Sequence, residues 1–280
     1  MKIGLVLEGG GKRGIYTAGV LDVFLENGIS FDGVIGVSAG AIHGCSYVSE
    51  QMGRSIRYNL KYGNDYRFMS LLSWFLTGNV VDTKFCYHTL PEKLDPFDNR
   101  TFMASKTDFY VVCSNVETGK PEYILCKDMV KDIDYLRASA SLPFVSRIVN
   151  LNGKKYLDGG ITDSIPFKAF KEMGYDKLVV VTTRPKYYRK KPFLLTWLAK
   201  LRYKKYPKFI EAILNRHKMY NREMDELQKL EDSRDILVIR PSRFINISKM
   251  EKNLNKVDEM YRLGREDAYN MIEKLKSYGV

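Results

Sequence analysis

A serine between two glycines is the first residue in this sequence whose setting could support nucleophilic chemistry. Ser38 lies in Gly36-Val37-Ser38-Ala39-Gly40, after the short strand-like run 32–37 and before a run of small residues. Such a Gly-x-Ser-x-Gly pattern is typical of a strained strand-to-helix turn, where a Cβ atom two residues from the serine would clash. The turn exposes the hydroxyl at a helix N-terminus, whose dipole favours a developing negative charge. The pattern therefore predicts a nucleophilic serine at position 38.

A second glycine-rich segment, Gly9-Gly10-Gly11-Lys12-Arg13-Gly14, follows the apolar run 2–7. Its glycine spacing fits a dinucleotide-binding loop, but bare backbone N–H groups also suit an oxyanion hole. A dinucleotide site needs an acid at the end of the second strand, where this chain has Ser38, and Asp32 precedes that strand. A P-loop is also disfavoured, because Lys12 precedes the final glycine and no Ser or Thr directly follows it. The sequence favours the oxyanion hole.

A nucleophilic serine needs a base, and histidine is the familiar one. The chain has His43, His88 and His217. A Ser–Asp–His order would leave only His217, whose cationic neighbours predict an exposed surface histidine. His43 follows Ser38 by five residues on the same predicted helix and should point from a different face. A histidine triad is therefore poorly supported.

A carboxylate is the other candidate base. Asp158 ends a predicted strand and precedes Gly159 and Gly160. Two glycines would let this backbone lie close to another without obstruction from side chains. The alternative is that Asp158-Gly159 only makes a turn, and these residues taken alone favour the turn.

The elements that must position these residues follow from apolar runs and turn residues. The order strand, glycine loop, helix, strand, serine turn, helix predicts a parallel sheet with right-handed crossovers. The aromatic segment 51–90 is expected to be mostly helical, and it could line an acyl pocket or simply pack in a core. The predicted strands are 2–7, 32–37, 108–114, 122–126, 147–151, 155–157, 178–183 and 235–239. The main predicted helices are 15–26, the one after Ser38, 133–140, 209–230 and 254–275.

Four motifs together make the sequence resemble the patatin-like phospholipase family. They are the glycine loop 9–14, the serine motif 36–40, the block Ala138-Ser139-Ala140-Ser141-Leu142-Pro143-Phe144, and Asp158-Gly159-Gly160. All four occur in the order typical of the family, and the resemblance covers residues 3 to about 183. The last hundred residues match only loosely.

The resemblance implies a three-layer α/β/α fold with a mainly parallel central sheet and a helical C-terminal part. It implies a Ser–Asp dyad, with Ser38 as nucleophile and Asp158 as general base and acid. Backbone N–H groups of the glycine loop would form the oxyanion hole, with Arg13 bracing it; the alternative for Arg13 is an ordinary surface cation. The implied donors are Gly10, Gly11, Lys12 and, as an extra contributor, Ala39. Neither a metal nor an organic cofactor is expected.

The formal net charge of +12 is concentrated in one stretch of the chain. Residues 184–222 contain thirteen Lys or Arg and one acid, Glu211. Cations interleaved with aromatic and aliphatic residues are typical of a helix lying on an anionic membrane, although nucleic-acid binding and a solvated cap are the alternatives. Given the implied lipid chemistry, we expect a lid or membrane-docking patch. The candidate docking residues are Lys190, Lys191, Trp197, Lys204 and Lys205.

These observations predict one domain with a catalytic core at 1–183, a basic excursion at 184–222 and a C-terminal strand and helix at 223–280. The expected function is lipid acyl hydrolysis of phospholipase A, lysophospholipase or carboxylesterase type; the alternative is a catalytically weak regulatory or lipid-binding module. The expected partners are a lipid or ester substrate and an anionic membrane surface, with no nucleic acid. No signal peptide or membrane span is visible, which favours a cytoplasmic, peripherally membrane-associated protein. The oligomeric state does not follow from the sequence.

Overall fold

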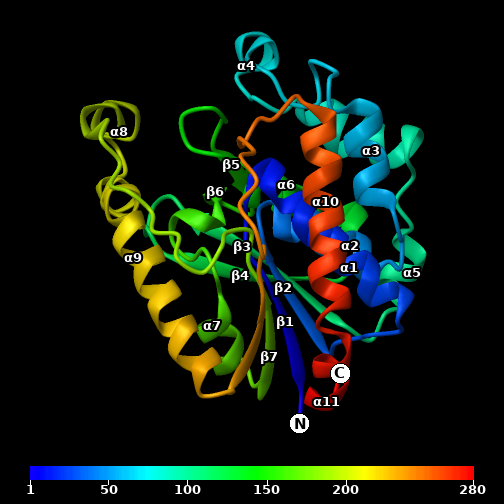
Figure 1. Ribbon diagram of the computed structural model, residues 1–280. Helices are drawn as coiled ribbons and strands as arrows, with labels where there is room; N and C mark the ends of the chain where they lie inside the picture. The colour runs from blue at the N-terminus through cyan, green and yellow to red at the C-terminus, as the bar shows by residue number, and fades with distance from the viewer.

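The computed structural model describes residues 1–280 and contains one mixed eight-stranded sheet. The strand order is β5-β6-β3-β2-β1-β7-β8, with β4 paired to β3, and the run from β3 to β8 is parallel (Figure 1). The strands are β1 (Ile3–Leu7), β2 (Gly33–Val37), β3 (Asp108–Asn115), β4 (Pro121–Cys126), β5 (Val149–Leu151), β6 (Lys154–Asp158), β7 (Lys177–Val181) and β8 (Ile236–Ile239). The predicted α/β class with a mainly parallel sheet is confirmed.

Helices cover both faces of this sheet and complete three layers. One face packs against α1 (Ile15–Glu26), α2 (Ala39–Val48) and α10 (Leu254–Tyr269), and the other against α7 (Phe167–Glu172) and α9 (Pro207–Asp232). The alternation along β1 shows why two cores form: Leu5 and Leu7 belong to the first, and Val6 belongs to the second. Successive side chains of a strand point to opposite faces, so a continuous apolar run requires cover on both sides.

Seven further α- or π-helices complete the structure. They are α3 (Arg54–Tyr62), α4 (Leu71–Thr77), α5 (Asn99–Ala104), α6 (Met129–Ser139), α8 (Thr196–Arg202), α11 (Ile272–Tyr278) and a π-helix over Phe85–Leu94. Two predicted helices differ from those in the structure. The predicted helix 254–275 is split into α10 and α11, and α6 begins four residues early because the Asp128 side chain caps it by accepting from the Val130 N–H.

The C-terminal helix α10 packs directly on α1. A Cβ atom on Gly19 would lie 2.1 Å from the Tyr261 carbonyl oxygen, and one on Gly264 would lie 2.1 Å from that of Tyr16. The helices therefore touch backbone to backbone at this crossing. A different helix, α9, continues past residue 222, where the sequence suggested a boundary between two parts of the chain. The predicted division of the chain stays a prediction. None of the helices combines the length and apolarity needed to cross a bilayer.

Candidate active site

The Gly-x-Ser-x-Gly segment forms a tight turn between β2 and α2. Ser38 has a positive φ of 54° with ψ −119°, and it occupies the N-cap position of α2 without a hydrogen bond from its side chain to the helix. A Cβ atom on Gly36 would lie 2.5 Å from the Cα of Ala41, and one on Gly40 would lie 2.5 Å from the carbonyl oxygen of Leu7. The turn lies so close to its own helix and to β1 that only glycine fits at these two positions.

Ser139, at the end of α6, holds the serine turn from the other side. Its Oγ accepts a hydrogen bond from the Ser38 N–H at 2.8 Å, and its side chain is fully buried. From the sequence, the block 138–144 was expected only as a family motif, with no role for Ser139. Its membership of that block is the one sequence signal that could have suggested a part in the site.

The strand register brings Ser38 and Asp158 together. Val37, at the end of β2, pairs with Val112 of β3, and the next β3 residue, Cys113, pairs with Asp158 at the end of β6. Because β4 occupies the other edge of β3 along this length, β2 and β6 share one edge and meet end to end. The residue that follows β2 therefore lies at the junction where β6 ends.

Asp158 is almost completely buried at this junction. Its Oδ1 accepts a hydrogen bond from the Gly160 N–H at 2.9 Å, and no hydrogen bond joins the carboxylate to Ser38. A Cβ atom on Gly159 would lie 2.1 Å from the carbonyl oxygen of Val112, so the glycine allows the backbone to cross β3 closely. Both Ser38 and Asp158 line one cavity.

The glycine loop presents unpaired donors beside Ser38. The backbone N–H groups of Gly10, Gly11 and Ala39 donate to no protein acceptor. The predicted donor Lys12 differs, because its N–H donates to the Lys249 carbonyl at 3.1 Å and is not available to a substrate. Three of the predicted backbone donors can therefore face an oxyanion.

Close packing of the loop on the serine turn explains its outer glycines. A Cβ atom on Gly9 would lie 2.9 Å from the Val37 carbonyl oxygen, and one on Gly14 would lie 2.5 Å from the Cβ of Ala39. Any larger residue at these positions would push the loop away from Ser38.

The two cations of the loop point into different cavities. Lys12 Nζ donates to Asn59 Oδ1 at 2.9 Å and lies 4.4 Å from the Phe68 ring centre, and burial lowers the pKa of Lys12 to about 8. Arg13 is buried on the other side, where its guanidinium donates to no protein acceptor. The predicted bracing of the loop by Arg13 therefore has no hydrogen bond to support it.

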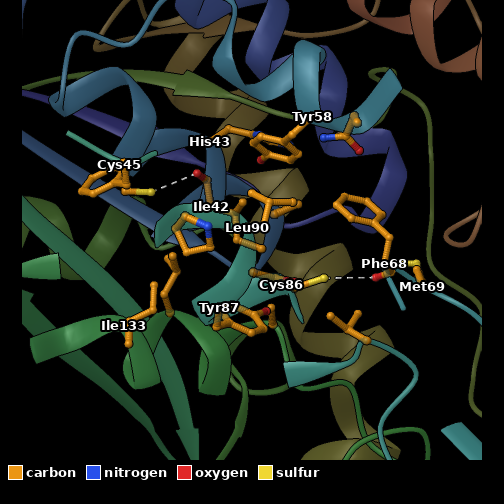
Figure 2. A pocket seen from close by; sticks show the side chains of 18 of the residues that line it. Ile42, His43, Cys45, Tyr58, Phe68, Met69, Cys86, Tyr87, Leu90 and Ile133 are labelled. Atoms are coloured by element: carbon orange, nitrogen blue, oxygen red, sulfur yellow. Dashed lines mark hydrogen bonds between the residues drawn. The ribbon is translucent and has the colours of Figure 1, made fainter. Parts of the chain in front are cut away.

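An apolar cavity of about 230 Å³ opens beside Ser38, and Figure 2 shows its inner wall. Nineteen of its 29 lining residues are hydrophobic, which makes it suited to a hydrocarbon chain. The segment 51–90, for which the sequence allowed either a pocket or a core, supplies a large part of the wall. Representative wall residues are Ile42, Tyr58, Phe68, Tyr87, Leu90 and Ile133.

A second cavity, of about 470 Å³, is polar and strongly cationic, and we call it the cationic cavity. It is lined by Ser38 and Asp158, and six Lys or Arg side chains face two carboxylates in its wall. The cations are Arg13, Arg184, Lys190, Lys191, Arg216 and Lys249. Ser38 and Gly11 line both cavities, so the serine lies where they meet.

The three histidines have separate positions. His43 is buried, its Nδ1 lies 2.9 Å from Ser55 Oγ, and burial lowers its pKa to about 3, as suits a structural residue. His88 is exposed beside Glu92. The prediction for His217 was wrong, because it is half-buried and lines the cationic cavity.

The error has an identifiable cause. Ile213 and Tyr220 of α9 are buried, and His217 lies between them at helical spacing, on the inward side of the helix. That periodicity was a usable signal.

The candidate docking residues divide into four that are exposed and one that faces inward. Lys191, Lys204 and Lys205 are exposed, and Trp197 of α8 is 62% exposed. Lys190 instead turns inward: its Nζ lies 4.1 Å from the Tyr220 ring centre, and its backbone exchanges two hydrogen bonds with the Asn221 side chain. Lys190 therefore belongs to the cationic cavity and is not placed to meet a membrane.

The chain is similar to known protein families and to individual proteins. A protein-family model described as patatin-like phospholipase matches residues 5–171, and a domain of unknown function (DUF6363) matches residues 206–279. The uncharacterized protein YjjU of Escherichia coli K12 is 35% identical over 190 residues, which cover 66% of this chain and 52% of YjjU. Lysophospholipase nte1 of Aspergillus fumigatus is 26% identical over 297 residues, covering 99% of this chain and 18% of that protein.

The chain thus spans about half the length of YjjU and less than a fifth of nte1. Among solved structures, VipD from Legionella pneumophila aligns with a TM-score of 0.47 at 14% identity, covering 98% of this chain and 67% of VipD.

Proposed function

Because the chain belongs to the patatin-like phospholipase family, we propose that it is a lipid acyl hydrolase that cleaves carboxylic esters through an acyl-Ser38 intermediate. The observation that carries this proposal is the register on β3, which sets Ser38 and Asp158 at facing strand ends in one cavity. The names of the fungal relatives, which are lysophospholipases, favour a lipid with an acyl ester as the substrate.

In this proposal Ser38 Oγ attacks the ester carbonyl while Asp158 accepts its proton. The N–H groups of Gly10, Gly11 and Ala39 stabilise the negative charge on the carbonyl oxygen of the tetrahedral intermediate. Collapse breaks the ester C–O bond, and Asp158 returns the proton to the leaving alcohol. A water molecule then attacks the acyl-enzyme by the same route and releases a carboxylic acid.

The apolar cavity is the proposed site of the acyl chain. It begins at Ser38 and is lined mainly by aliphatic and aromatic side chains, so a chain bound there would leave its ester carbonyl beside the hydroxyl. No group of three or more His, Cys, Asp or Glu side chains converges on a potential metal site, and the proposed steps use side chains and backbone alone.

The test uses a fluorophosphonate probe, which reacts with activated serines, and hydrolysis of an uncharged monoacylglycerol. Wild type should be labelled and active, and Ser38→Ala should be neither. Asp158→Asn should lower both rates by about 10²-fold or more, because a positioned general base is worth that much. Circular dichroism checks that both variants fold.

Two outcomes would contradict the proposal. Labelling that persists in Ser38→Ala would mean that another residue is the nucleophile. Folded wild type that neither reacts nor hydrolyses ester would favour the regulatory or lipid-binding alternative.

We also propose that two exposed apolar helices form a docking surface for an anionic membrane. Figure 1 shows α4 and α8 projecting at one end of the molecule. Large apolar side chains beside cations match an interface of acyl chains and anionic headgroups. The docking surface consists of Leu71, Leu72, Phe75 and Leu76 from α4 and of Leu194, Trp197, Lys200, Leu201, Arg202, Lys204 and Lys205 around α8.

A further inference from the structure

The cationic cavity contains an excess of charge that nothing in the protein neutralises. Arg13, Arg184, Lys190, Arg216 and Lys249 line it, and none of these five cations forms an ion pair with a carboxylate. Their only side-chain hydrogen bond runs from Arg216 Nε to the Gly160 carbonyl at 2.5 Å. Except for the exposed Lys249, these cations are buried or half-buried. Cations partly withdrawn from water without partners are unfavourable, so such a cluster indicates a site for an anion.

The two carboxylates in the cavity wall are already engaged. Glu8 accepts from the Tyr220 hydroxyl at 2.9 Å and from the Thr183 N–H at 2.6 Å, and Asp158 accepts from the Gly160 N–H. Both carboxylates thus already accept hydrogen bonds within the protein, and the cations of the wall outnumber them, so the wall as a whole favours an anionic ligand.

Aromatic faces could also bind a quaternary ammonium, and four aromatic side chains line this cavity. The guanidinium of Arg184 lies 4.1 Å from the Tyr188 ring centre, and Lys190 Nζ lies 4.1 Å from that of Tyr220. The protein's own cations thus cover the two tyrosine rings, and the other two rings, Phe144 and Phe193, stack on each other with their centres 5.4 Å apart.

The cations also repel one another. Burial and the neighbouring Arg216 lower the pKa of Lys190 to about 7. Burial and Arg184 lower the pKa of Arg13. An anion with two negative charges would relieve this repulsion, whereas a neutral ligand would not.

We propose that the cationic cavity binds the phosphate of a lipid whose acyl chain occupies the apolar cavity, and that it selects monoacyl lipids with a phosphomonoester headgroup over zwitterionic ones. This inference rests on the proposed function, because it needs the ester to lie at Ser38, where the two cavities meet. Hydrolysis adds water across the ester C–O bond and yields a fatty acid and glycerol phosphate. Four of the five cations lie outside residues 5–171, so the later part of the chain supplies most of the headgroup site.

The test compares three octanoyl substrates that differ only in headgroup: a lysophosphatidic acid, a lysophosphatidylcholine and an uncharged monoacylglycerol. Short chains keep the substrates monomeric, so the docking surface is not involved. The kcat/KM of wild type should be at least tenfold higher for the phosphomonoester than for the choline lipid. Inorganic phosphate should raise the KM of the phosphomonoester substrate.

Lys190→Gln and Lys249→Gln should each reduce the ratio of phosphomonoester to monoacylglycerol hydrolysis about tenfold. The matched control is Lys229→Gln, which removes an exposed cation of α9 outside the cavity and should keep the wild-type ratio. Circular dichroism excludes unfolding as the cause of a changed ratio.

The outcomes separate this inference from the proposed function. A labelled, active enzyme with equal kcat/KM on the two phospholipids would overturn the headgroup inference alone. If inorganic phosphate binds but the two phospholipids have equal kcat/KM, the cavity is a site for free phosphate. That result would also overturn the headgroup inference. Loss of Ser38 labelling and of monoacylglycerol hydrolysis would instead contradict the proposed function.

Discussion

Ser38 reaches the cavity because its neighbours hold its backbone in an unfavourable conformation. A positive φ is strained for a serine and persists only where surrounding contacts fix it. Here Gly36 and Gly40 make room for the turn, and Ser139 binds the Ser38 N–H from the other side. The position of one hydroxyl thus depends on a side chain about a hundred positions later.

Replacement of Ser139 by alanine should weaken the turn. The Ser38 N–H would lose its acceptor in a buried place, which costs about 1–3 kcal/mol of the free energy of unfolding. The displaced hydroxyl should also slow fluorophosphonate labelling by about tenfold or more. Urea denaturation measures the free energy of unfolding, and the time course of probe labelling measures the reactivity of Ser38.

The matched control is Ser141→Ala, which removes a hydroxyl that donates only to the Arg137 carbonyl. It should lower stability without slowing the labelling of correctly folded protein. An unchanged labelling rate in Ser139→Ala would show that the turn does not need this hydrogen bond.

Residue identity was easier to predict from the sequence than side-chain direction. Ser38 was selected from its local pattern and Asp158 from the family resemblance, and the structure brings them to one cavity. Lys12, Lys190 and His217 were misjudged, because which side a cation or histidine faces depends on the elements that pack around it. The Lys12 N–H could not have been excluded as a donor, since its acceptor lies at Lys249.

At the scale of elements, β3 is the frame of the site. It pairs with β2 and then with β6 along the same edge, one parallel and one antiparallel. The sequence predicted both neighbouring strands but not their end-to-end meeting, because strand partners far apart in the chain are not encoded in local periodicity. The split between α10 and α11 was missed for a similar reason, since the apolar pattern continues across it.

A pair of carboxyl groups between α9 and the segment after β6 should make stability depend on pH. Burial raises the pKa of Asp163 to about 6, and burial together with the Asp163 charge raises that of Glu223. The folded state therefore holds these protons more tightly than the unfolded chain does. The pair therefore contributes its full stability at pH values below the unfolded-state pKa of the two acids. This contribution is lost as the pH rises through about 6, the pKa of Asp163 in the folded state.

Glu223→Gln should reduce this loss, because the amide keeps an acceptor for the Ser164 N–H without the charge. Its melting temperature should fall less than that of wild type between pH 5 and pH 8. Glu211→Gln, an exposed position on the same helix, should follow wild type. Parallel curves for wild type and Glu223→Gln would refute the role assigned to the pair.

For the whole molecule, the arrangement of surfaces suggests an orientation on a membrane. The docking surface, with α4 and α8, lies at one end, and the helices α10 and α11 lead the C-terminus towards the opposite end (Figure 1). Two separate helices would fix the tilt of the molecule, whereas one alone would leave it free to rotate.

The double variant Phe75→Ser and Trp197→Ser should weaken vesicle binding. Phe75 is 82% exposed, so its replacement removes apolar surface without disturbing the core. Full burial of such a side chain is worth about 1.5–3 kcal/mol, so partition into vesicles should fall about tenfold or more. Co-sedimentation with phosphatidylglycerol vesicles measures this.

Met103→Ser, on α5, is the control, because it removes an exposed apolar side chain outside the docking surface. Equal binding of the double variant and wild type would rule out the proposed surface.

The contact between α1 and α10 restricts which residues homologous sequences can carry at two positions. Gly19 and Gly264 each face the backbone of the opposite helix, and a methyl group on either would strike a carbonyl oxygen. Neither position can accept a larger residue unless the helix axes move apart, and that movement would disturb the packing at both positions. In an alignment of close homologues, the two positions should therefore change together or stay glycine together, although 245 positions separate them along the chain.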